Sequence, residues 1–99
     1  MSIPNGFKEA KQAVIAALRS GLFQHEARGR IDEKNVLPAG VVSASEVEAI
    51  IRRSRGSEHQ CSPHHQVPSV DVHVIVSQGW YIKFYFIDNP DTMFISVHQ

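Results

Sequence analysis

Cysteine and long apolar runs are what this sequence has least of. Cys61 is the only cysteine among 99 residues, so no disulfide can form within the chain. No apolar run approaches the roughly 20 residues that a membrane-spanning helix needs, and the N-terminus lacks the apolar core of a signal peptide. We therefore expect a cytoplasmic protein with no membrane partner.

An excess of charge of either sign is also missing. Ten Lys and Arg residues balance ten Asp and Glu residues, so no global positive field draws in nucleic acid. The six histidines are the compositional excess, and imidazole can supply positive charge at mildly acidic pH or beside phosphates. Composition therefore weighs against a simple basic nucleic-acid-binding module, but not against one that uses histidine.

The length leaves room for one small core. A chain with 42% hydrophobic and 20% charged residues has an ordinary globular composition. A domain of this size buries only about 60 to 65% of its unfolded surface, so it gains stability from a partner subunit. We predict a single domain over residues 1–99 and count a homodimer or a hetero-complex among its expected states.

Two helices are predicted in the first half of the chain. Apolar residues at helical spacing predict a helix over residues 6–20, with Asn5 as its N-cap and Gly21 as its left-handed C-terminal residue. A capping-box pattern that begins at Ser43 predicts a second helix over residues 44–55. Both helices carry an apolar stripe, so both should pack on the same core.

The segments that flank the second helix read as connections. Residues 22–42 contain Gly and Pro and are expected to form a connector, with a short helical turn at residues 24–28. Residues 56–69 lack an apolar period and contain two prolines, so we expect a loop or a covering flap.

The last third of the chain alternates apolar and polar residues. Residues 70–98 predict three strands joined by two hairpins, a three-stranded antiparallel meander. The expected fold class is therefore α+β, with two N-terminal helices packed on the apolar face of a C-terminal three-stranded antiparallel sheet.

The alternation also predicts a register. A two-residue turn at Gln78-Gly79 would mix polar and apolar residues on each face, so we expect a three-residue loop with Gly79 in the bulge position. The apolar face would pair Val76 with Trp80, Val74 with Ile82, Val72 with Phe84, Phe86 with Met93, Phe84 with Ile95 and Ile82 with Val97. The polar face would carry the rows Asp71-Tyr85-Phe94, His73-Lys83-Ser96 and Ile75-Tyr81-His98.

The expected polar face combines imidazoles, a lysine and phenols. This set suits metal-free RNA cleavage, in which a general base takes the 2′-OH proton, a cation stabilises the phosphoryl oxygens and a general acid protonates the leaving 5′-oxygen. Bases also stack on exposed aromatic rings such as those of Tyr81, Tyr85 and Phe94. The alternative is a plain solvated sheet face, on which Lys, Tyr, Ser and His are ordinary residues.

The two C-terminal strands carry a family resemblance. The stretch Trp80-Tyr81-Ile82-Lys83-Phe84, followed by Phe94-Ile95-Ser96-Val97-His98, resembles the C-terminal hairpin of the motility quorum-sensing regulator (MqsR) toxins. Those toxins are small sequence-selective mRNA endoribonucleases with a RelE-like α+β fold, usually neutralised by a cognate antitoxin. The resemblance implies a toxin of the mRNA interferase type with RNA as substrate, in which Tyr81 takes the place of the family's functional Tyr and His98 that of its C-terminal functional Lys.

A second, shorter likeness lies upstream, where His25 to Arg30 is similar to the His-x-x-x-Arg opening of RelE-superfamily domains, here with the spacing His-x-x-Arg. No metal or cofactor is required by this chemistry. The residues expected to act in catalysis are Tyr81, His98, Lys83 and His73. Those expected to bind RNA are His25, Arg28, Arg30, His64, His65, Gln66, Tyr85 and Ser96.

Two other classes of function remain open. The segment His59–His65 concentrates imidazole and thiol, which are good ligands for zinc or copper, although its spacing matches no closed structural site. A small metal-binding protein is therefore one alternative. The other is an interaction protein, such as an antitoxin or an immunity protein, for which small size and neutral charge are ordinary.

Overall fold

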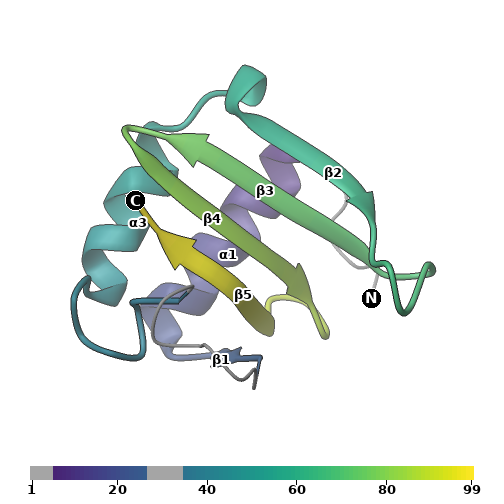
Figure 1. The fold of residues 1–99 in the computed structure, drawn as a ribbon, viewed down its shortest axis with the longest axis horizontal. Coiled ribbons are helices and arrows are strands. Elements are labelled where there is room, and N and C mark those ends of the chain that lie inside the picture. Colours follow the sequence, from purple (N-terminus) through teal and green to yellow (C-terminus); the bar gives the residue numbers. More distant parts are fainter. Residues whose placement is uncertain (1–5, 27–34) are drawn as a thin grey trace.

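The computed structural model describes residues 6–26 and 35–99. These residues form two α-helices that lie on one side of a five-stranded mixed sheet, with strand order β1-β5-β4-β3-β2 (Figure 1). The α+β class is therefore confirmed, whereas the three-stranded antiparallel sheet is corrected to a five-stranded mixed one. The elements are α1 (Phe7–Ser20), β1 (Phe23–His25), α3 (Ala44–Arg53), the 3-10 turn η1 (Gly56–Glu58), β2 (His59–Pro63), β3 (Asp71–Ser77), β4 (Trp80–Phe86) and β5 (Thr92–His98).

The helix ends follow the sequence signals closely. Gly21 ends α1 with φ 76°, and its N–H donates to the carbonyl of Ala17, as expected for a left-handed C-terminal glycine. The Ser43 side chain accepts the N–H of Glu46 in a complete capping box that begins α3. The N-cap of α1 is Gly6 and not Asn5, and Asn5 itself lies outside the described residues.

Both helices bury their apolar stripes against the same face of the sheet. In Figure 1 they lie behind the strands, and the core that joins them is made of Ala10, Ala13, Val14 and Leu18 of α1, Val47, Ile50 and Ile51 of α3, and Ile75, Ile82, Phe84, Phe86, Phe94 and Val97 of the sheet. Nothing in either described stretch of chain is a helix long and apolar enough to cross a membrane.

Two strands lie where the sequence predicted irregular structure. β1, expected as part of a helical turn, pairs in parallel with β5, so that Phe23 faces Thr92. β2, expected as loop, pairs antiparallel with β3, so that His59 faces Ile75. Neither strand shows a clear alternation of apolar and polar residues. Each lies at an edge of the sheet, where backbone hydrogen bonds to one neighbouring strand are its main stabilisation.

The predicted register of β3 against β4 was wrong by one residue. Gln78 and Gly79 form a two-residue turn with φ 55° and 80°, the backbone of a type I′ hairpin, so Ser77 pairs with Trp80. This shift turns every side chain of β3 to the other face. His73 therefore faces the helices opposite Phe84, and the valines of β3 lie on the side that the helices leave uncovered.

The second hairpin agrees with the prediction along half of its length. Tyr81 pairs with His98, Ile82 with Val97 and Lys83 with Ser96, as predicted. A β-bulge after Lys83 then shifts the register, so Phe84 faces Phe94 and not Ile95. Phe94 is consequently buried in the core and does not join the polar face.

Candidate functional site

The open face is the side of the sheet opposite α1 and α3, and β4 supplies its centre. Ile82 and Phe84 of β4 are fully buried under the helices, so the alternate residues Tyr81, Lys83 and Tyr85 project from the open face. Alternate residues on a strand are about 6.6 Å apart. These three side chains therefore form a row along which an extended ligand can lie.

One end of this row is a stacked pair of rings. The phenol of Tyr81 and the imidazole of His98, its partner on β5, are stacked with centroids 5.1 Å apart and planes 18° apart. The Nδ1–H of His98 donates to the backbone oxygen of Gln99 at 3.1 Å. A neutral His98 ring with its proton on Nδ1 leaves Nε2 as a lone-pair acceptor, so this imidazole is suited to act as a base.

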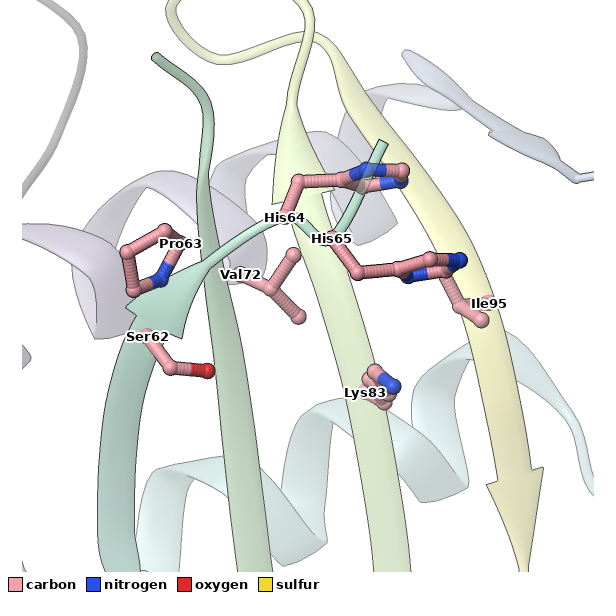
Figure 2. Close-up of a pocket in the computed structure, with 7 residues that line it drawn as sticks. All are labelled: Ser62, Pro63, His64, His65, Val72, Lys83 and Ile95. Carbon is pink, nitrogen blue, oxygen red and sulfur yellow. The ribbon is translucent and has the colours of Figure 1, made fainter. Parts of the chain in front are cut away.

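The middle of the row opens into a small pocket. Lys83 lines a hollow of about 130 Å³ together with two histidines, His64 and His65, from the segment that follows β2 (Figure 2). Ser62, Pro63, Val72 and Ile95 complete the lining. The pocket thus brings a fixed cation and two imidazoles together on a floor of aliphatic side chains, and such a set favours an anion with several oxygen atoms.

A tight turn after β2 positions the two histidines. The N–H of His64 donates to the carbonyl of Val70 at 2.7 Å, and this bond continues the pairing of β2 with β3 by one residue beyond Pro63. The His64 ring meets Tyr85 edge to face with centroids 5.5 Å apart, and His65 stacks on it at 5.2 Å with planes only 5° apart. His64 is 8% exposed as a result, whereas His65 is exposed.

A second hollow lies beside Tyr81. It has a volume of about 270 Å³ and is lined by valines of β3, by the Tyr81 ring and by polar groups from η1 and β2, namely Ser57, Glu58, Gln60, Val74, Val76 and Tyr81. An aromatic ring, aliphatic walls and amide or carboxylate acceptors are the features that a nucleobase pocket requires.

Comparisons with protein-family models, with curated proteins and with solved structures found no match for this chain.

The open face gathers most of the residues that the sequence singled out. Tyr81, Lys83, Tyr85, Ser96 and His98 occupy it through the strand register, and His64 and His65 reach it from the β2–β3 connection. Gln66 contributes its backbone N–H to the turn by donating to His64. Gln60 and Ser62 of β2 were missed, since the sequence of this edge strand gave no sign that it pairs with β3.

Two predicted site histidines lie on the helix side instead. His73 is fully buried and stacks on Phe84 with centroids 5.5 Å apart, so it cannot reach a ligand on the open face. His25 lies in β1, hydrogen-bonds Asn35 at 2.9 Å and contacts Phe94, and burial lowers its pKa. Arg28 and Arg30 lie outside the described residues.

His73 instead belongs to a histidine pair inside the fold. Its Nδ1 is 3.0 Å from Nε2 of His59, and the two rings are stacked. His59 also packs on Phe7 of α1 with centroids 5.3 Å apart. Burial lowers the pKa of His59, because a charged imidazole loses hydration there.

The proposed metal ligands do not converge. Cys61 pairs with His73 and so lies on the opposite face of β2 from the pocket that holds His64. Burial, and after it the charge of Asp71, raises the pKa of the Cys61 thiol, which disfavours the thiolate that a metal would need. Across residues 6–26 and 35–99, no three His, Cys, Asp or Glu side chains are grouped as metal ligands.

Proposed function

We propose that this protein is a metal-independent endoribonuclease that binds single-stranded RNA on the open face. The observation that carries the proposal is the arrangement of Lys83 within a two-histidine pocket, next along β4 to the Tyr81–His98 stack. A fixed cation, an imidazole base and aromatic rings then share the surface of the sheet that α1 and α3, the two helices described, leave uncovered.

His98 is the proposed general base. Its Nδ1–H is held by a backbone oxygen, so Nε2 is available to take the proton of a ribose 2′-OH. Cross-strand diagonal neighbours such as His98 and Lys83 have Cβ atoms about 7 to 8 Å apart. That separation lets one residue face the 2′-OH while the other faces the adjacent phosphate.

The reaction is an internal transesterification. The 2′-oxygen forms a bond to phosphorus as the bond from phosphorus to the 5′-oxygen breaks, leaving a 2′,3′-cyclic phosphate and a free 5′-OH. Lys83 stabilises the added negative charge on the phosphoryl oxygens. Tyr81 keeps His98 in place by stacking, and the exposed imidazole of His65, when protonated, supplies the proton to the 5′-oxygen.

The test is cleavage of a single-stranded RNA by the purified protein in the presence of a metal chelator. We expect products with 2′,3′-cyclic phosphate ends. His98→Gln and Lys83→Gln should each lower the cleavage rate by about 10²-fold, because each removes one group that acts in the transition state.

Lys8→Gln is the matched control. Lys8 is exposed on α1, on the helix side of the sheet, so its loss removes the same charge without touching the open face and should leave the rate unchanged. Equal losses in the Lys8→Gln and Lys83→Gln variants would reduce the role of Lys83 to general charge, and intact RNA after incubation with wild-type protein would rule out the proposed activity.

The placement of two helices on one side of an antiparallel β3-β4-β5 unit supports a RelE-like domain, and a toxin with this activity in the cytoplasm requires a cognate antitoxin. An antitoxin that covers the open face would block Lys83 and the Tyr81–His98 stack together.

An interaction protein is the second candidate. It is favoured by the second hollow, where Val74 and Val76 lie beside the Tyr81 ring and Val76 is 52% exposed, because anchor side chains of a protein partner bind in apolar pockets. Under this reading the wild-type protein leaves RNA intact, and expressing it protects cells from a toxic partner instead of harming them.

A further inference from the structure

We propose that His64 is a fixed hydrogen-bond donor, acting only through Nε2–H, for a phosphoryl oxygen bound in the Lys83 pocket. The identification of the phosphate as that of RNA rests on the proposed function. The donor role itself follows from how the turn holds the His64 ring.

Two backbone groups occupy one nitrogen of that ring. The N–H of Gln66 donates to Nδ1 of His64 at 3.1 Å, and the N–H of Val67 donates to the same atom at 3.2 Å. An atom that accepts hydrogen bonds cannot carry a proton, so the neutral ring must carry its proton on Nε2. Protonating Nδ1 would break both bonds and open the turn.

The turn around this ring is held at several points. The N–H of Val70 donates to the carbonyl of Val67 at 2.9 Å, and the N–H of His64 donates back to Val70. The ring itself stacks on the His65 imidazole and makes a T-shaped contact with the Tyr85 ring. His64 therefore reaches the pocket already ordered, which is what an effective donor to a developing charge requires.

His65 shares the ring stack with His64 but lacks the backbone bonds that fix the His64 ring. It is exposed, and within the described part of the chain neither of its ring nitrogens makes a hydrogen bond. Its ring lies flat on that of His64 beside Lys83 (Figure 2). The two adjacent histidines thus differ in how they are held: backbone hydrogen bonds fix the His64 ring, whereas the His65 ring is exposed and held by stacking alone.

The pocket composition identifies the ligand class as a phosphoryl oxyanion. Lys83 supplies charge, His64 supplies a directed N–H, and the Ser62 hydroxyl lies on the same lining. A volume of about 130 Å³ is enough for a group of phosphate size but not for a nucleotide. The rest of a bound strand would then follow the row of β4 side chains toward Tyr81.

Two substitutions of His64 separate the donor role of its Nε2–H from the role of its Nδ1 as acceptor of the two backbone bonds in the turn. In His64→Asn the side-chain oxygen takes the place of Nδ1 and keeps the two backbone bonds, but the Nε2 donor is lost. In His64→Gln the amide nitrogen takes the place of Nε2 and keeps the donor, but the acceptor at Nδ1 is lost. A donor role and an anchoring role therefore predict opposite orders for the two variants.

The experiment titrates the full chain with inorganic phosphate and monitors the ¹⁵N-labelled imidazoles by NMR. A thermal melt of each variant measures its stability. We expect the spectrum of free wild-type protein to show Nδ1 of His64 without a proton and Nε2 with one. Phosphate should shift that Nε2 signal, and His64→Asn should bind phosphate about tenfold more weakly or worse while melting close to wild type. His64→Gln should bind more tightly than His64→Asn despite melting lower.

Phosphate binding by His64→Asn that equals wild type would overturn the assignment, as would a His64 ring protonated on Nδ1. The wild-type cleavage assay reports separately on the proposed function. If the protein binds phosphate through His64 but leaves RNA intact, the donor role of His64 stands and the ribonuclease activity is ruled out. If it cleaves RNA but His64→Asn binds phosphate as wild type does, the activity stands and the donor role is ruled out.

Discussion

At the scale of single residues, His59 makes the stability of the fold depend on pH. Burial lowers its pKa from 6.5, so below about pH 6.5 the unfolded chain binds more protons at this residue than the folded chain does. The free energy of unfolding should therefore fall as the pH drops below about 6.5. The stability that depends on a neutral His59 is fully retained above that pH. Glu48, whose pKa lies below 4.5 because Arg52 and Arg19 bond its carboxylate, contributes only in a more acidic range.

The measurement is urea unfolding at several pH values between 4.5 and 6.5, the reference values of the carboxyl and imidazole groups. His59→Gln keeps a side chain that can hydrogen-bond His73 but cannot titrate, so its stability should fall less steeply with acid than that of wild type. His25, with a pKa lowered in the same direction by burial, leaves a residual slope. An unchanged slope in His59→Gln would assign the whole effect to other groups.

At the scale of elements, the turn between β3 and β4 decides which face each side chain of β3 occupies. Gly79 has φ 80° and open space where a Cβ would be, so Gly79→Ala should cost about 1 kcal/mol through backbone strain alone. Gly56→Ala is the matched control, since its new Cβ would only touch the Phe7 ring at 3.6 Å and its φ is ordinary. Thermal melts should show Gly79→Ala lower by about 4 to 8 °C and Gly56→Ala near wild type.

The register that this turn sets could not be predicted from the sequence, whereas the helices could. Both helices were predictable, because Ser43 and Gly21 mark their ends and one apolar stripe has only one stable orientation. β3 is apolar on both faces, with Ile75 inside and Val72 covered by the His64 turn, so alternation could not choose its register. His73 looks like a surface histidine in sequence, and the register of β3 on β4 places it in the core opposite Phe84, next to His59.

The candidate site was predictable in part for the same reason. Tyr81 beside His98 and Lys83 beside Ser96 depend on β4 and β5, whose alternation is clear up to the bulge. The pocket around Lys83 depends on a turn built from backbone bonds to an imidazole. Such bonds leave no pattern of residue types in a sequence. The sequence therefore indicated His64 and His65 as candidates but could not distinguish their roles.

At the scale of the whole molecule, the net charge of +0 limits how RNA can be held. Lys83 is the one lysine or arginine on the open face among the described strand residues. Affinity should therefore come from stacking on Tyr81 and from pocket contacts more than from counterion release. For a single strand the slope of log K against log salt is about −0.7 per phosphate neutralised, so one lysine predicts a slope of about −0.7.

The measurement is fluorescence anisotropy with a labelled RNA and the His98→Gln variant, between about 50 and about 200 mM salt. The shallow slope should flatten further in His98→Gln/Lys83→Gln, while His98→Gln/Tyr81→Ala should weaken binding without changing the slope, because the ring carries no charge. A slope steeper than about −4 would mean that basic residues away from the open face hold the strand. The exposed Arg52, Arg53 and Arg55 at and after the end of α3 would then become the RNA-binding surface, and the open face would lose its role as the docking site.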